Sequence, residues 1–151
     1  GQLQFGLTDT DDALIELELM VPKGSNSGIY VQGEYEVQVL DSYGKENLGM
    51  GDMGAIYGAA PPRVNACKEP GQWQKYQIYF HAPKFDANGH KVKNARFEKV
   101  ILNGQVIQEN AEMAKNTPGG VDGKEKPLGP LMFQGNHGPV AYRNIEIKPL
   151  P

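Results

Sequence analysis

The sequence of 151 residues contains a single cysteine, Cys67. One thiol cannot form a disulfide within the chain or assemble a cysteine-based zinc site. No apolar run approaches the roughly 18 residues that a membrane-spanning helix needs. The first residues, GQLQFGLTDTDD, have neither the charged nor the apolar part of a secretory signal. We therefore expect a soluble chain without a membrane span, from which any export signal has already been removed.

The sequence also lacks any cluster of Lys and Arg. Its 15 basic residues are outnumbered by 18 acidic ones, which gives a formal net charge of −3. Binding to a phosphate backbone depends on grouped cations. We therefore expect no nucleic-acid partner.

Motifs for metals and nucleotides are missing as well. There is no HExxH helix, and the acidic run DTDD lacks the Gly and terminal Glu of an EF-hand loop. The glycines of GMGDMG are not followed by a helical pattern, so they do not form a nucleotide-binding loop. We expect no cofactor and no metal at the site, while a structural calcium held by loop Asp and carbonyl groups stays open.

What the sequence does contain is a series of strand-like runs separated by turns. No segment sustains a helical period, and 19 Gly and 11 Pro indicate many turns. The chain length suits one domain. These features predict an all-β sandwich of antiparallel strands, in which residues 114–130 form a long surface loop. The runs are ALIELELMV, GIYVQG, YEVQVLD, GAIYG, WQKYQIYFHA, RFEKVILNG, QVIQENAEM, GPLMFQG and VAYRNIEIK.

The run YEVQVLD carries polar residues along one side of a predicted strand. Tyr35, Val37 and Val39 occupy the odd positions, and side chains alternate across a strand, so this set is expected to face the core. Glu36 and Gln38 occupy the even positions and are expected to face either solvent or a ligand cleft. Glu34 continues the even series, and its Cα atom is expected roughly 6 to 7 Å from that of Glu36 along the strand. This spacing is compatible with a catalytic pair of carboxyl groups.

One histidine stands out by its neighbours. His137 lies in FQGNHGPV, where glycines let the backbone approach a ligand and Gln134 and Asn136 lie beside it. Aromatic residues alternate with amides and acids elsewhere in the chain, as a sugar site requires, because sugar rings stack on aromatic faces and their hydroxyls need donors and acceptors. The alternative is that Trp73 and several tyrosines fill the core.

Six segments in order give a more specific indication. NSGIYVQGEYEVQVLDSYG, GAIYG, PPRVNA, GQWQKYQIYFHAPKFDANGHK, LNGQVIQEN and GPLMFQGNHGPVAYRNIEI resemble the hallmark segments of the 3-keto-disaccharide hydrolase domain family. The resemblance runs from about Asp12 to Ile147. It implies a concanavalin A-like jelly-roll sandwich and, in characterised members, cleavage of glycosides whose glucose unit is oxidised at C3.

The resemblance also implies a site. Carried over by motif position, the catalytic candidates are Glu36 and His137, and the substrate-binding candidates are Tyr30, Gln32, Gln38, Asp41, Tyr57, Asn65 and Gln134. It further implies a saccharide substrate or ligand and an exported bacterial protein, secreted or periplasmic. The oligomeric state is not indicated.

The sequence departs from the family pattern at two places. Relatives usually carry a longer N-terminal region, so we expect residues 1–151 to form a single jelly-roll domain in which QLQFG is what remains of that strand region. In FQGNHG, Gly135 and Asn136 stand where a more acidic residue is common. Three hypotheses follow: a hydrolase or lyase acting on 3-keto-glycosides, a sugar-binding module without activity, or a purely structural domain of a larger extracellular protein.

Overall fold

The computed structural model of the chain describes residues 2–135 and 137–151, and for residues 2–8 the backbone alone. Its described part contains eleven strands and no helix, so no helix in it could cross a membrane. The strands are β1 (Gln2–Thr10), β2 (Ala13–Met20), β3 (Asn26–Val31), β4 (Tyr35–Leu40), β5 (Trp73–His81), β6 (Lys84–Phe85), β7 (Lys91–Lys93), β8 (Ala95–Leu102), β9 (Gln105–Met113), β10 (Gly129–Gln134) and β11 (Ala141–Pro149).

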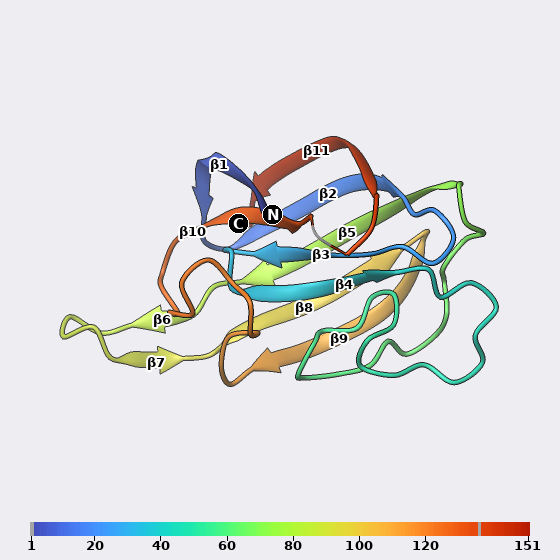
Figure 1. Ribbon diagram of the computed structural model, residues 1–151. Coiled ribbons are helices and arrows are strands. Elements are labelled where there is room, and N and C mark those ends of the chain that lie inside the picture. Colours follow the sequence, from blue (N-terminus) through green and yellow to red (C-terminus); the bar gives the residue numbers. More distant parts are fainter. Residues whose placement is uncertain (1, 136) are drawn as a thin grey trace.

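The strands form two main antiparallel sheets. The four-stranded sheet has the order β1-β10-β3-β4, and the five-stranded sheet has the order β11-β2-β5-β8-β9. Figure 1 shows β3 and β4 lying over the five-stranded sheet, while the β6–β7 hairpin projects from one end. The predicted all-β sandwich is confirmed.

The core lies between the sheets and follows from alternation along the strands. In β2, Ile15, Leu17 and Leu19 are at most 1% exposed, while the residues between them face outward. In β4, Val37 and Val39 are fully buried and meet this layer from the other sheet. Alternating apolar residues place one face of each strand in the core, as the sequence indicates.

Two local predictions have different outcomes. The Asn103-Gly104 pair in LNGQV predicts a type I′ hairpin, and the structure confirms it: both residues have positive φ, 51° and 82°, and join β8 to β9. In WQKYQIYF the aromatic and apolar residues change parity between Trp73 and Tyr76, which predicts a bulge. This prediction is wrong, because β5 pairs with β2 in continuous register from Trp73 to Phe80. Trp73 instead lies on the outer face, with the guanidinium of Arg143 3.7 Å from its ring centroid.

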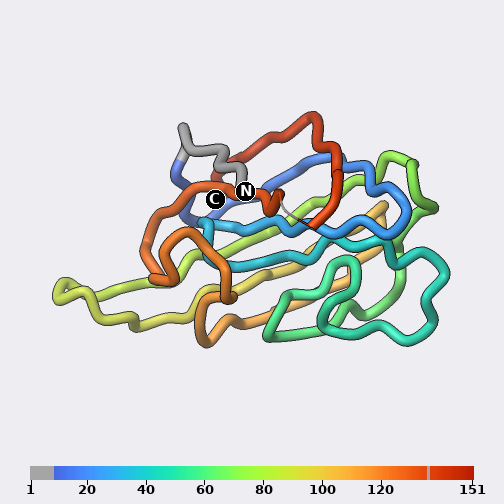
Figure 2. The backbone as a smooth tube through the Cα atoms, viewed as in Figure 1, coloured from blue at the N-terminus to red at the C-terminus, as the bar shows by residue number. Residues whose placement is uncertain are grey.

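Two long loops flank the outer face of β3 and β4. Residues 41–72 follow the end of β4, and residues 114–128 lie beside the turn between β3 and β4 (Figure 2). In the second loop the amides of Thr117 and Val121 donate to the carbonyls of Glu34 and Gly33. The two loops therefore form walls beside this polar face.

Candidate functional site

Glu36 lies at the floor of a cleft on the outer face of the four-stranded sheet. Its neighbours Tyr35 and Val37 point into the core, so the Glu36 side chain points the other way, yet it is only 5% exposed. The cleft has a volume of about 250 Å³. It is lined by Asn26, Tyr30, Glu36, Gln38, Tyr57, Pro118, Gln134 and His137.

Gly28 on β3 makes room for the carboxyl group of Glu36. A Cβ atom at position 28 would lie 1.9 Å from Oε2 of Glu36 and 2.9 Å from its Cδ. The φ of Gly28 is not in the left-handed region, so glycine is needed here for space and not for backbone conformation. The carboxyl group thus folds across the neighbouring strand, where a larger residue would displace it.

The backbone of Glu36 holds both walls of the cleft. Its amide donates to Oγ1 of Thr117 at 3.0 Å, and its carbonyl accepts from the amide of Tyr57 at 3.3 Å. The Thr117 hydroxyl in turn donates to the carbonyl of Tyr57 at 3.5 Å. An edge strand exposes unpaired backbone groups, and here those groups of β4 attach Tyr57 and the 114–128 loop directly beside the carboxylate.

Burial changes the acidity of Glu36. Loss of hydration disfavours the charged carboxylate and raises the pKa of Glu36 to about 7. Both the acid and the carboxylate are therefore populated near neutral pH. A group with this property can give or take a proton at physiological pH.

Gln38 presents an oriented amide to the cleft. Its Nε2 donates to Oδ1 of Asn26 at 3.3 Å and to the carbonyl of Gly51 at 3.0 Å. With both N–H groups used, Oε1 is the atom that can accept a hydrogen bond from a ligand. The side chain is 7% exposed, so its orientation is fixed before any ligand arrives.

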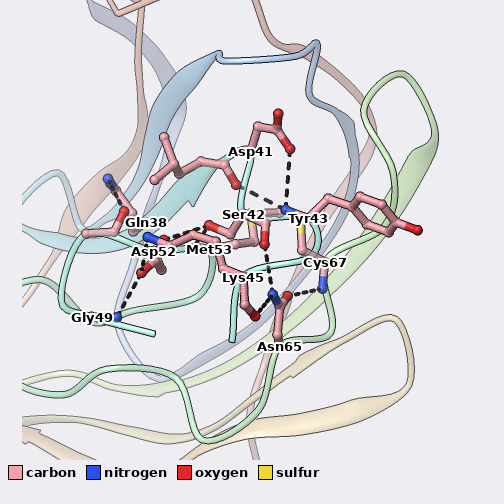
Figure 3. A network of polar contacts seen from close by, with 12 residues as sticks. Gln38, Asp41, Ser42, Tyr43, Lys45, Gly49, Asp52, Met53, Asn65 and Cys67 are labelled. Carbon is pink, nitrogen blue, oxygen red and sulfur yellow. Dashed lines mark hydrogen bonds and ion pairs between the residues drawn. The ribbon is translucent and has the colours of Figure 1, made fainter. Parts of the chain in front are cut away.

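The segment that carries Gly51 is held by a buried carboxylate (Figure 3). Asp52 is 3% exposed, and it accepts hydrogen bonds from the Ser42 hydroxyl, the Lys45 ammonium and the Gly49 amide. Asn65 donates to the carbonyls of Ser42 and Lys45. These contacts fix the loop that positions Gln38 and leads to Tyr57.

Six of the residues predicted for the site meet in this cleft: Tyr30, Glu36, Gln38, Tyr57, Gln134 and His137. The other three lie outside its lining. Gln32 donates to the carbonyls of Thr10 and Pro127, and Asp41 accepts from the amide of Gly24. Asn65 belongs to the loop network described above. Their polar groups are used to hold loops and strand ends.

Two lining residues were not predicted. Asn26 has the same parity as Tyr30 on β3, so alternation along that strand could have indicated it. Pro118 gives no such signal, because a loop residue reaches the cleft only through the path of the folded loop. Asn136, which the sequence places beside His137, lies outside the described residues.

Glu34 does not share the cleft with Glu36. Its carboxylate accepts hydrogen bonds from the amides of Asp122 and Gly123, and it is 3% exposed. Glu34 therefore anchors the 114–128 loop. Glu34 and Glu36 have the sequence spacing of a catalytic pair, but their carboxyl groups have different partners and do not share the cleft.

Replacing Glu34 by Ala is expected to loosen this wall. The loss of two charge-assisted hydrogen bonds should lower the free energy of unfolding by about 1–3 kcal/mol and speed hydrogen exchange at residues 117–123. Thermal unfolding and hydrogen-exchange mass spectrometry would measure both effects. Glu46→Ala, at an exposed position, is the control; equal exchange in the two variants would show that Glu34 is not the anchor.

Within residues 2–135 and 137–151, no His, Cys, Asp or Glu side chains gather in groups of three or more that could hold a metal ion. The described residues that line the cleft and carry acid–base groups are Glu36, His137, Tyr30 and Tyr57. This set can transfer protons and bind hydroxyl groups.

Comparison with known proteins identifies relatives of the whole chain. The sequence profile of one family, described as a 3-keto-alpha-glucoside-1,2-lyase-like domain, matches residues 4–148. A protein of Parabacteroides distasonis, described as a candidate glycosyl hydrolase, is 33% identical; the match covers 99% of this chain and 68% of that one, with a TM-score of 0.86. No match was found among curated protein sequences.

More distant structures share the fold. A variant of alginate lyase Aly36B bound to an alginate trisaccharide is 11% identical, with a TM-score of 0.56, over 99% of this chain and 75% of that one. The chicken liver agglutinin CG-16 is also 11% identical, with a TM-score of 0.50, over 98% of this chain and 100% of the agglutinin. The predicted jelly-roll sandwich and the predicted family are both confirmed.

Proposed function

The chain belongs to the 3-keto-alpha-glucoside-1,2-lyase-like domain family, and we propose that it is a carbohydrate-active enzyme that cleaves 3-keto-glycosides in the cleft above Glu36. The observation that carries this proposal is the buried carboxyl group of Glu36. Its pKa is raised to about 7, and aromatic and amide side chains surround it. Such a group is suited to proton transfer on a bound sugar.

The number of carboxylates favours elimination over ordinary glycoside hydrolysis. Glycosidases of the common types use a pair of carboxyl groups that flank the scissile bond. Among the described residues that line this cleft, Glu36 is the one carboxylate. A ketone at C3 of the sugar makes the hydrogen on C2 acidic. The C1–O bond can then break by elimination, which does not need a second carboxyl group.

The reaction can be written in two stages. A base takes the proton from C2, and its electron pair moves onto the C3 oxygen as an enolate. The C3 carbonyl then re-forms, a C1=C2 double bond forms and the C1–O bond breaks, so that the leaving oxygen takes a proton from an acid. Water then adds OH to C1 and a proton to C2, which releases the free 3-keto sugar. Glu36 and His137 are the proposed acid–base pair.

The remaining lining residues have binding roles in this proposal. Tyr57 is 44% exposed, so its ring is accessible for stacking against a sugar face. Gln38 offers its fixed Oε1 acceptor, and Asn26 and Gln134 add amide groups that can bind hydroxyls. An exported location, secreted or periplasmic, remains a prediction that fractionation of the native cells would test.

A panel of substrates tests the proposal against its rival, a sugar-binding module without activity. The purified protein would be incubated with 3-keto-trehalose, 3-keto-cellobiose and a 3-keto aryl glucoside, each beside its unoxidised parent. Release of sugar from the keto compounds alone is the expected result. Saturable binding by calorimetry without any release of sugar would instead favour the binding module. Neither binding nor release would contradict both the enzyme and the binding-module hypotheses.

A further inference from the structure

Two amide side chains on adjacent strands of the cleft are hydrogen-bonded to each other. Asn26 lies on β3 and Gln38 on β4, and both line the cleft. The Nε2 atom of Gln38 donates to Oδ1 of Asn26 at 3.3 Å and to the carbonyl of Gly51 at 3.0 Å. Because a carbonyl can only accept a hydrogen bond, Gly51 fixes which end of the Gln38 amide carries the nitrogen.

The orientation of Gln38 decides the orientation of Asn26. A primary amide carries two donors on its nitrogen and an acceptor on its oxygen. If the Asn26 amide were turned over, its Nδ2 would face Nε2 of Gln38, and two donors would meet. Asn26 therefore uses its oxygen toward Gln38 and keeps the N–H groups of Nδ2 for another partner. No described residue accepts a hydrogen bond from this nitrogen, and the side chain is half-buried.

The two ends of the pair that are left for a ligand have opposite hydrogen-bonding character. Gln38 presents Oε1, which is an acceptor, because both of its N–H groups are used. Asn26 presents Nδ2, which is a donor. Since the two amides are bonded to each other, these ends lie at the same part of the cleft. A ligand that pairs with both needs an acceptor next to a donor.

We propose that this pair binds a vicinal hydroxy ketone: the ketone oxygen accepts from Nδ2 of Asn26, and the adjacent hydroxyl donates to Oε1 of Gln38. A ketone has lone pairs and no proton, so Asn26 is the member of the pair that it can use. The C3 ketone of a 3-keto sugar, with hydroxyl groups on C2 and C4, has this arrangement. The step from a hydroxy ketone to that sugar rests on the proposed function.

Asn26 also lies at a suitable distance from Glu36. The carboxyl group of Glu36 lies over Gly28, where a Cβ atom would be 1.9 Å from its Oε2. Asn26 is the next residue on the same face of β3, roughly 6 to 7 Å further along the strand. One sugar ring can therefore place its C2 near the Glu36 carboxyl group and its C3 oxygen near Asn26.

This position gives Asn26 a role in the elimination. When the base takes the proton from C2, the electron pair moves onto the C3 oxygen, which becomes the oxygen of an enolate. The hydrogen bond from Nδ2 strengthens as this oxygen gains negative charge, so it stabilises the transition state more than the bound ketone. Asn26 is in this account a catalytic residue, because it touches one of the reacting atoms.

Asn26→Asp tests the pair with two ligands that have no glycosidic group at C1, 1,5-anhydroglucitol and its 3-keto derivative. Aspartate keeps an oxygen for Gln38 but has no donor for a ketone. The C3 hydroxyl of the parent ligand can turn and donate to the new carboxylate, whereas the ketone cannot. In calorimetry the affinity for the keto ligand should fall about tenfold or more, and that for the parent should stay within roughly threefold.

Three outcomes of this titration would overturn the proposal. Equal losses for both ligands would show that Asn26 affects the cleft in general and not the ketone. Unchanged affinities would show that Asn26 touches neither ligand, and a wild type that binds neither would show that the cleft does not take a hydroxy ketone. Asn88→Asp, on the exposed turn between β6 and β7, is the control for the added charge and should leave both affinities unchanged.

NMR of the ¹⁵N-labelled wild type gives a second readout if Asn26→Asp folds poorly. In the free protein the side-chain amide protons of Gln38 should exchange slowly with solvent, because both are hydrogen-bonded, and those of Asn26 should exchange fast. Saturation with the keto ligand should slow exchange at Asn26 about tenfold or more. Exchange at Asn26 that stays fast in the complex would contradict the proposal.

Deuterium exchange at C2 of the same keto ligand separates this proposal from the proposed function. The wild type should speed the exchange in D₂O, and Asn26→Asp should lower the enzymatic rate by about 10²–10³-fold, the usual cost of removing one donor to an oxyanion. The expected change in affinity without any exchange or cleavage would leave the binding pair standing and reject the proposed function. Cleavage of the substrate panel, with affinities unchanged in Asn26→Asp, would do the reverse.

Discussion

Glu36→Gln is expected to lower kcat for a 3-keto-glycoside by about 10²–10⁴-fold, the usual contribution of a positioned acid or base. Glutamine has the shape of the protonated side chain but cannot transfer its proton. The cleft floor and the space above Gly28 should therefore remain as they are. Steady-state kinetics would measure the loss, and calorimetry with the same substrate should give a dissociation constant within roughly threefold of the wild type, since uniform binding is kept.

Glu112→Gln serves as the control for this result. Glu112 is exposed on β9 of the other sheet, so the same change of charge there should leave kcat unaltered. Near-normal turnover by Glu36→Gln would remove Glu36 from the chemistry. A parallel loss of affinity and turnover would point to a binding role for it instead.

Gly28→Ala is expected to have the second large effect. The new Cβ atom would lie 1.9 Å from Oε2 of Glu36, so the carboxyl group must move or β3 must shift. Overpacking of this kind typically costs about 1–3 kcal/mol. A displaced acid also loses its alignment with the sugar, and a misplacement near 1 Å can cost about 10²-fold in rate. Unfolding curves and kcat would report the two effects separately.

A double variant separates this clash from a general sensitivity of β3. In the Glu36→Ala background the side chain that Gly28 accommodates is gone, so adding Gly28→Ala should cost little stability. The coupling energy between the two positions would then be close to the whole cost of Gly28→Ala. Additive losses would show that Gly28 has another role in the sheet.

The sequence predicts those parts of the fold that depend on local patterns. Alternation identifies β2 and β4 because one face of each packs in the core. The Asn103-Gly104 pair identifies the β8–β9 hairpin because both residues tolerate positive φ. The GAIYG run, by contrast, is not a strand. Ile56 makes only isolated bridges to Val37 and Ala60, so this segment lies along the edge of β4 without forming a strand of its own.

The site is only partly predictable, because its geometry depends on pairs that are distant in sequence. Parity along β4 places Glu36 and Gln38 on one face, but it does not reveal that Gly28 leaves space for the carboxyl group. That contact depends on the register between β3 and β4. Alternation along the strand also does not reveal that the Glu34 carboxylate accepts hydrogen bonds from the amides of Asp122 and Gly123. The family motif predicts Gln32 as a substrate-binding residue. In the structure its side-chain amide instead donates to the backbone carbonyls of Thr10 and Pro127.

The most direct test of the central claim, that this cleft breaks a glycosidic bond by elimination through C2, is to run the reaction in D₂O and locate deuterium in the product. Mass spectrometry and NMR of the released 3-keto sugar would be compared with authentic 3-keto sugar incubated with Glu36→Gln, which corrects for spontaneous exchange. Elimination followed by hydration predicts deuterium at C2 in each turnover, above that background. Release of a sugar that retains its original hydrogen at C2 would contradict the account, because it would mean that the bond at C1 is displaced directly.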